Sequence, residues 1–185
     1  MPVLVAILVV LVAPVLIVAL MYNSLVTLRN MCDEAWSNID TELKRRYDLI
    51  PNLVETVKGY AAHERQVLQR VAELRARAVQ STGSPQSQAR DENELVRALR
   101  SLFVVVERYP ELKASRQFLE LQRELALTED RIQAARRFYN ANVRDFNSRI
   151  QVFPSNLVAG AFQFAPREFF EIEDVGVRAA PEVRL

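Results

Sequence analysis

Apolar residues recur every three or four positions along one long stretch of the chain, between residues 25 and 78. This spacing places them on one face of an α-helix. The phase continues across Pro51, which removes one helical hydrogen bond and crowds the preceding turn. The pattern therefore predicts one long helix over residues 23–79, with a kink between Tyr47 and Pro51. The apolar positions are Leu25, Leu28, Cys32, Ala35, Ile39, Leu43, Tyr47, Ile50, Val54, Val57, Ala61, Val67 or Leu68, Val71, Leu74 and Ala78.

Two further periodic segments follow a break at residues 81–87, which is rich in small and polar residues. Such a composition is typical of a turn or short loop. The first segment predicts a helix over residues 88–108. The second predicts a helix over residues 111–152, and Pro110 suits the start of that helix because its ring presets a helical backbone angle.

The last part of the chain predicts a short helix and then an extended tail. The helix is expected across residues 157–161, with Ser155 or Asn156 as its cap. Prolines and a glycine interrupt the remaining residues 162–185. The apolar residues expected to clip this tail onto the helices are Phe169, Phe170 and Ile172.

The first 22 residues carry no charged side chain. At a rise of about 1.5 Å per residue they span roughly 30 Å, which is the hydrocarbon thickness of a bilayer. The alternative is a cleaved signal peptide, which begins with a positive region and ends at small residues. No Lys or Arg precedes this run, and residues 18–21 lack a clear cleavage site. The segment therefore predicts an uncleaved transmembrane anchor.

Basic residues near the anchor predict its orientation. Arg29, Lys44, Arg45 and Arg46 follow the anchor, and no charged side chain precedes it. We therefore expect a single-pass membrane protein with its N-terminus outside and its helical domain in the cytoplasm.

Composition narrows the fold class and the partners. The chain has only four glycines, and Leu, Ala, Glu, Arg and Gln are abundant, which favours an all-α protein. We expect an N-terminal transmembrane helix over residues 1–22 that continues into an antiparallel up-and-down bundle over residues 23–155. The bundle would contain three main helices, followed by a short C-terminal helix and tail over residues 156–185. The net charge of +1 leaves no basic field for nucleic acid.

Several sequence blocks resemble a known family. They are YNSLVTLRN at residues 22–30, RRYDLIPNLVETVKGYAAHE at residues 45–64, FLELQRELALTEDRI at residues 118–132 and AARRFYNANVRDFN at residues 134–147. Their order and spacing resemble the LemA family of bacterial membrane proteins. The resemblance implies one N-terminal span, a short outer N-terminus and an inner antiparallel bundle of long helices. It implies no activity, since the family as a whole lacks an established one.

A dense set of polar residues surrounds Pro51. Arg45 with Asp48, and Glu55 with Lys58, stand at helical ion-pair spacing. One interpretation is a solvated face whose groups also satisfy the backbone freed by the proline. The other is a polar network between helices, or a subunit contact, that determines register. The candidate residues are Arg45, Arg46, Asp48, Asn52 and Glu55.

No residue pattern predicts catalysis, a cofactor or a metal ion. A zinc-protease helix needs a second histidine four residues after His63, and Val67 occupies that position. Cys32 lies on the apolar stripe and is expected to be a buried thiol. Catalytic, cofactor-binding and metal-binding sites are therefore not expected.

Two functions fit these features. The first is a membrane-anchored scaffold that contacts lipid, assembles with further copies of itself and organises the membrane or its partners. The second is an adaptor that presents a helical face to a separate, unidentified protein. We also expect the segment 23–40 to lack full cover within the chain, so that Leu28 and Trp36 lie at a contact between copies.

Overall fold

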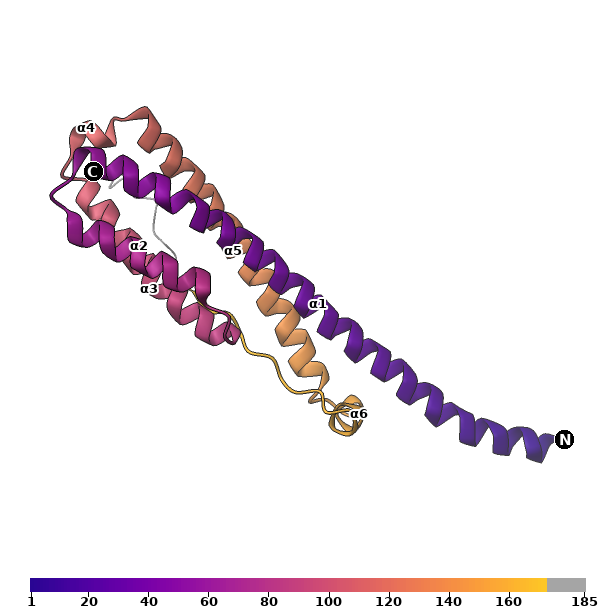
Figure 1. Ribbon diagram of the computed structural model, residues 1–185. Coiled ribbons are helices and arrows are strands. Elements are labelled where there is room, and N and C mark those ends of the chain that lie inside the picture. Colours follow the sequence, from indigo (N-terminus) through magenta and orange to yellow (C-terminus); the bar gives the residue numbers. More distant parts are fainter. Residues whose placement is uncertain (173–185) are drawn as a thin grey trace, which may run out of the picture.

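The computed structural model describes residues 1–172, and every regular element within them is a helix. The all-α prediction is therefore confirmed, and residues 173–185 of the expected tail lie outside the described part. The helices, labelled in Figure 1, are α1 (Pro2–Tyr60), α2 (Arg65–Gln80), α3 (Pro85–Val106), α4 (Pro110–Lys113), α5 (Arg116–Arg149) and α6 (Ser155–Ala161).

The long helix expected over residues 23–79 is in fact two helices. α1 ends at Tyr60, the chain reverses over residues 61–64, and α2 runs back along α1. Gly59, which destabilises a helix interior, stands just before the reversal. The apolar period does not reveal the break because Ala61, fully buried at the corner, fits the pattern. The bundle consequently has four long helices, α1, α2, α3 and α5, instead of three.

The helix expected over residues 111–152 is also divided. A short turn of helix, α4, precedes α5, and Ser115 lies between them in an extended conformation. The expected cap of the last helix is wrong as well. The hydroxyl of Ser155 donates back to the carbonyl oxygens of Arg149 and Val152, at 2.6 and 2.9 Å, so it does not cap α6.

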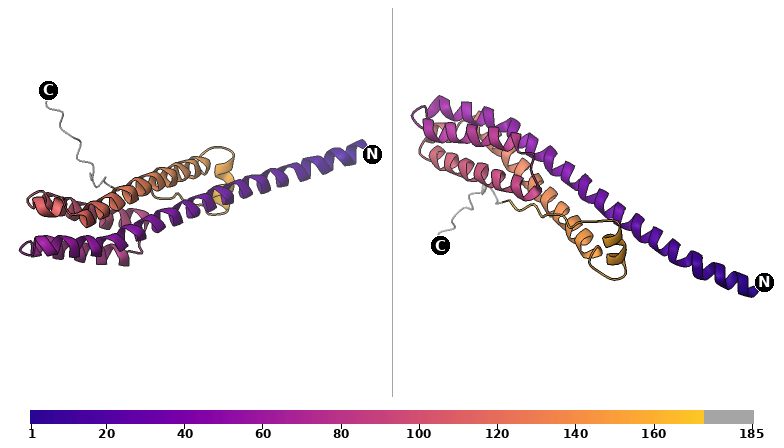
Figure 2. Two further views of the ribbon diagram at one scale, coloured as in Figure 1. Left: turned by 90° about the horizontal axis from the view of Figure 1, so that it is seen from above. Right: turned by 60° about the horizontal axis from the view of Figure 1, so that its bottom comes forward.

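The bundle is built on the antiparallel pair α1 and α5, the most extensive helix contact in the described chain (Figures 1 and 2). The hairpin of α2 and α3 packs at the end of this pair that is far from the N-terminus. α6 lies at the opposite end of α5, beside α1, and beyond α6 the remaining part of α1 projects alone. The predicted apolar stripe faces inward, as the full burial of Leu25, Ile39 and Val57 shows.

α1 continues through Pro51 without interruption. Because proline has no N–H, it leaves the carbonyl oxygen of Tyr47 without its usual helical donor. The guanidinium of Arg75, on α2, donates to this oxygen from Nε at 2.9 Å. The freed backbone group is thus satisfied from a neighbouring helix, and not by the polar residues next to Pro51.

Residues 164–172, here called the strap, run back along α5 in extended form. The side-chain amide of Asn147 pairs with both backbone groups of Arg167, each at 2.8 Å, and that of Asn140 pairs with Phe170 at 2.9 and 3.0 Å. Seven helical residues rise about 10.5 Å, and three extended residues span about 10 Å, so the two pairs are in register.

The strap also forms the predicted apolar clip. Phe170 and Ile172 are buried in the main core, whereas Phe169, which lies between Glu168 and Phe170 in the extended chain, points outward. This alternation is the normal consequence of an extended backbone. The clip therefore consists of two of the three predicted residues.

Candidate functional site

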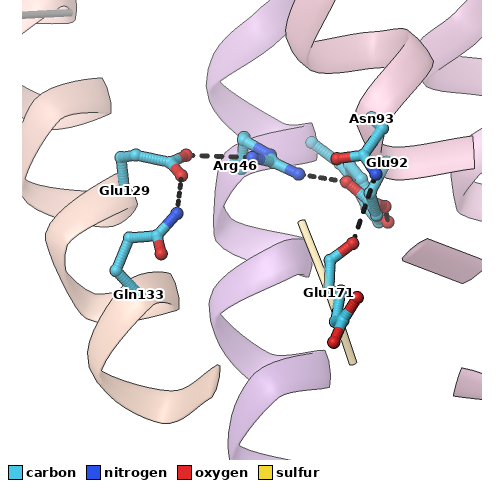
Figure 3. A network of polar contacts seen from close by, with 7 residues as sticks. Arg46, Glu92, Asn93, Glu129, Gln133 and Glu171 are labelled. Atoms are coloured by element: carbon cyan, nitrogen blue, oxygen red, sulfur yellow. Dashed lines mark hydrogen bonds and ion pairs between the residues drawn. The ribbon is translucent and has the colours of Figure 1, made fainter. Parts of the chain in front are cut away.

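A single arginine lies at the centre of the bundle. Arg46 projects from α1 toward α3 on one side and α5 on the other, and only 1% of the residue is exposed (Figure 3). Its Nη1 donates to the Oε2 of Glu129 on α5 at 2.9 Å, and its Nη2 donates to Glu92 on α3. Both carboxyl groups are themselves buried. We call these residues, with Tyr47 and Gln133, the Arg46 network.

Neutral donors extend the network, although the buried Nε of Arg46 itself has no hydrogen-bond partner among the described residues. The Tyr47 hydroxyl donates to the second oxygen of Glu92, and the side-chain amide of Gln133 donates to Glu129 at 3.0 Å. One guanidinium therefore faces two carboxyl groups, and a hydroxyl and an amide supply additional hydrogen bonds. Buried polar groups are nearly always hydrogen-bonded in this way, since an unsatisfied one is costly.

The electrostatics keep the arginine charged. Burial by itself lowers the pKa of the Arg46 guanidinium, but the adjacent carboxylates of Glu92 and Glu129 outweigh this effect and raise the pKa. The pKa of the Tyr47 hydroxyl is raised strongly, first by burial and then by the negative charge of Glu92, so this hydroxyl remains a donor. The network is thus expected to keep its hydrogen bonds at physiological pH.

The network joins three helices at one level of the bundle. Close beside it, the amide of Asn93 on α3 donates to the carbonyl oxygen of Glu171 in the strap at 3.2 Å (Figure 3). Buried ion pairs add little net stability, but a shifted register would leave a charge buried without its partner. The arrangement is therefore suited to holding α1, α3 and α5 in one relative position, and solvent does not reach it.

The structure divides the predicted polar set. Arg46 alone lies in a network between helices, and the other four members are exposed on the outer face of α1. Arg45 contacts Glu42 at 3.5 Å instead of the expected Asp48, whereas Glu55 and Lys58 pair at 3.2 Å as predicted. The solvated-face interpretation thus describes Arg45, Asp48, Asn52 and Glu55, and the network interpretation describes Arg46.

Trp36 and Leu28 pack within the chain. The Trp36 ring lies 5.3 Å from that of Tyr139 and 5.2 Å from that of Phe170, and Leu28 packs at the edge of the main core. Leu25, Cys32, Ala35 and Ile39 are fully buried, and Leu28 and Trp36 are partly buried, so the expectation that this segment lacks cover is wrong for its inward face. The reason is that α1 ends at Tyr60 instead of continuing to residue 79, so α5 and the strap, which run back from that end, reach the level of this segment.

Sequence reasoning missed Glu92, Glu129 and Gln133. A signal was nevertheless present, because Glu92 and Glu129 occupy positions where the apolar stripes of α3 and α5 would continue. A glutamate at a position that the helical period places on the buried face indicates that a charged partner is buried with it. The apolar pattern does not indicate which of the many arginines is that partner.

The other candidate chemistry is placed outside this network. Cys32 is buried as predicted, and burial raises the pKa of its thiol. His63 lies exposed in the reversal between α1 and α2. Within residues 1–172, no group of three or more His, Cys, Asp or Glu side chains is arranged to hold a metal ion.

Comparison with known proteins identifies relatives over most of the chain. Protein LemA of Metamycoplasma hominis is 27% identical over 153 residues, which cover 83% of this chain and 70% of that protein. Magnetosome protein MamQ 2 of Paramagnetospirillum magneticum is 26% identical, and magnetosome protein MamQ of Magnetospirillum gryphiswaldense is 25% identical, each over 180 residues. These matches cover 84% of this chain but only 66% of the magnetosome proteins.

None of these names denotes an enzyme. The model of the LemA family matches residues 35–185, from within α1 to the end of the chain. This match includes the Arg46 network and the strap. The chain therefore belongs to the LemA family.

Proposed function

We propose that this protein is a non-enzymatic, single-pass helical scaffold that assembles with further copies of itself at the bacterial inner membrane. The supporting observation is the uncovered apolar part of α1. Among the described residues, α1 is the one helix long and apolar enough to cross a membrane. Leu11, Val15 and Leu20 are exposed to the surroundings, and a contiguous apolar surface of this kind is unfavourable in water.

The continuity of α1 explains how such a protein could act. The 59 residues of α1 form the apolar segment and then the central helix of the bundle without a break. Residues 23–60 would extend roughly 60 Å from the membrane at 1.5 Å per residue. Because the Arg46 network holds α3 and α5 on this helix, the bundle would keep a constant orientation relative to the span.

Contact between copies is proposed mainly in the span. The inward face of residues 23–40 is covered within the chain, which leaves the apolar segment as the large uncovered surface. Ala13 and Ala19 are small residues of the kind that let neighbouring spans approach closely. Closed symmetric assemblies are the commonest outcome of such contacts.

Membrane insertion and orientation are tested together in cells. The full chain should remain in the membrane fraction after alkaline carbonate washing, and its presence in the supernatant would contradict the anchor. A Thr82→Cys variant places a thiol in the exposed loop before α3 and leaves the Ser84 cap intact. An impermeant maleimide should label it only after lysis. Labelling in intact cells would mean that the orientation is the opposite one. Protein without the added cysteine shows how much labelling comes from the buried Cys32.

Assembly is tested by light scattering in mild detergents, with the detergent mass subtracted. We expect a mass several times that of the 21.2 kDa chain, and we expect Ala13→Leu to reduce it more than Val12→Leu does. A monomeric mass in every detergent would contradict self-assembly. It would favour the adaptor, in which a helical face is presented to a separate protein.

A further inference from the structure

A second uncharged segment lies far along the chain from the first. Residues 150–166 carry no charged side chain, and they contain α6 with the turns on either side of it. Outside the N-terminal apolar region, the chain has no uncharged run of this length. The segment also has two faces. Val158 and Ala159 pack against Leu25 of α1, whereas large apolar side chains point outward.

The outward side chains are unusually exposed for their type. The exposed fraction is 78% for Phe153, 64% for Leu157 and 54% for Phe162. They come from the turn before α6, from α6 itself and from the residue that follows it. Three large apolar residues on one short segment make a surface that water solvates poorly.

The fold places this surface beside the end of the apolar part of α1. α6 packs against Met21 and Leu25, and the ring of Tyr22 lies 4.8 Å from that of Phe162. In both views of Figure 2, α6 lies close to α1, and the rest of α1 extends beyond it alone. The two uncharged segments, more than a hundred residues apart in sequence, are therefore neighbours in space.

Arginines border this surface. Residues 1–32 and 146–167 contain no acidic residue, but they contain Arg29, Arg149 and Arg167. The guanidinium of Arg29 stacks over the ring of Phe164 at 5.4 Å from its centroid, and Arg167 pairs with Asp33 at 2.7 Å. Arg149 is exposed at the end of α5. Arg29 and Arg149 are exposed at this level, and exposed arginines suit the phosphate level of a bilayer.

We propose that α6 and its flanking turns form a second membrane contact, in which Phe153, Leu157 and Phe162 enter the boundary between headgroups and acyl chains. This inference rests on the proposed function, in which α1 crosses the bilayer. Interfacial segments bury their apolar face about 5–10 Å below the headgroups, and aromatic residues concentrate at that depth. A lipid surface fits better than a second copy, because the apolar surface continues directly into the span and is bordered by arginines.

The second contact would change how the bundle is held. A single spanning helix leaves the whole molecule, span and bundle together, free to tilt in the bilayer and to turn about its long axis. Contact at α6, to one side of α1, would fix one face of the bundle toward the membrane. The Arg46 network and the strap would then transmit this orientation to the far end of the bundle.

Fluorescent probes on the full chain test this contact in vesicles of phosphatidylcholine and phosphatidylglycerol. An environment-sensitive dye is attached to Leu157→Cys, and intensity is measured with and without nitroxide-labelled lipid. Leu119→Cys is the matched control, because it replaces another exposed leucine, 49% exposed, at the end of α5 far from α6. Leu16→Cys reports on the span itself. Protein without an added cysteine controls for Cys32, which is buried.

We expect the Leu157 probe to emit at shorter wavelength than the Leu119 probe and to lose intensity with nitroxide lipid, as the Leu16 probe does. Quenching at Leu16 with a Leu157 probe that behaves like Leu119 would overturn the α6 contact and leave the span intact. A shorter wavelength at Leu157 without lipid quenching would identify protein as the occupant and would also overturn it. Absence of quenching at Leu16 would overturn the span, and the α6 contact with it.

Discussion

Replacement of Arg46 by methionine is the most direct test of the buried network. The substitution removes the cation that lies between Glu92 and Glu129 and leaves two carboxyl groups facing each other in the bundle interior. Breaking a buried ion pair by removing one partner costs about 3–5 kcal/mol, because the remaining charge is left without compensation. For a chain of this size, each kcal/mol lowers the melting temperature by about 2–4 °C, so we expect a decrease of about 6–20 °C.

The neighbouring arginine provides a matched control. Arg45 has the same side chain on the same helix, but 46% of that side chain is exposed, and its contact with Glu42 is 3.5 Å long. Exposed pairs at this spacing contribute about 0.2–0.5 kcal/mol, so Arg45→Met should change the melting temperature by about 2 °C or less. The comparison isolates the effect of burial from the effect of losing one positive charge.

Thermal melts of the full chain in one mild detergent, followed by circular dichroism, measure both variants. A triple variant, Arg46→Met with Glu92→Leu and Glu129→Leu, should recover much of the loss, since a buried ion network can often be replaced by apolar residues of similar volume. Equal melting temperatures for Arg46→Met and Arg45→Met would show that the network does not form. A triple variant no more stable than Arg46→Met would show that unpaired charge is not the cause of the loss.

The remaining predictions concern pH, the core and the strap. Burial raises the pKa of Tyr139 to about 12, and it raises the pKa of Tyr47 strongly. The contribution of each tyrosine to the free energy of unfolding should therefore be fully present below about pH 10 and then fall by about 1.4 kcal/mol per pH unit. Tyr47→Phe should flatten this alkaline loss in melts at several pH values, and an unchanged slope would contradict the assignment. Ile132→Ala should cost about 2–5 kcal/mol and Gln66→Ala less than about 0.5 kcal/mol; similar values would mean that the helix phase is wrong. Asn140→Ala should release the strap and increase hydrogen exchange at the backbone N–H of Phe170, and unaltered exchange would show that the amide pair does not hold it.

The proposed scaffold depends on features that act at different distances from the membrane. The uncovered part of α1 would position the chain, α6 would orient it, and the Arg46 network and the strap would keep the bundle rigid. No one of these features requires a catalytic group. Each can be removed by a substitution that leaves the others in place, so their contributions can be separated.

The helical character of the chain could be predicted from the sequence, and so could the buried face of each helix. Both are local properties. An apolar residue such as Ile39 or Val57 is buried because its position in the helical period places it on the inward face, whatever it contacts there. The membrane-length apolar segment is a property of the same kind, since length and hydropathy are sufficient to recognise it.

The connections between distant residues could not be predicted. The reversal at residues 61–64 is invisible to periodicity, because a stripe continues unchanged whether the helix runs on or folds back. Arg46 finds its partners 46 and 83 residues away, and nothing in its own neighbourhood distinguishes it from Arg45 except its phase. The period indicates that a side chain is buried, but it contains no information about which side chain will meet it.

The same limit applies to the two uncharged segments. The sequence alone determines that residues 1–28 and 150–166 carry no charge, because this depends only on composition. Their contact depends on the length of α5, which returns the chain from the far end of the bundle to the level of Leu25. Only the tertiary structure decides this contact, since it results from how far each helix extends and which face of its neighbour it covers.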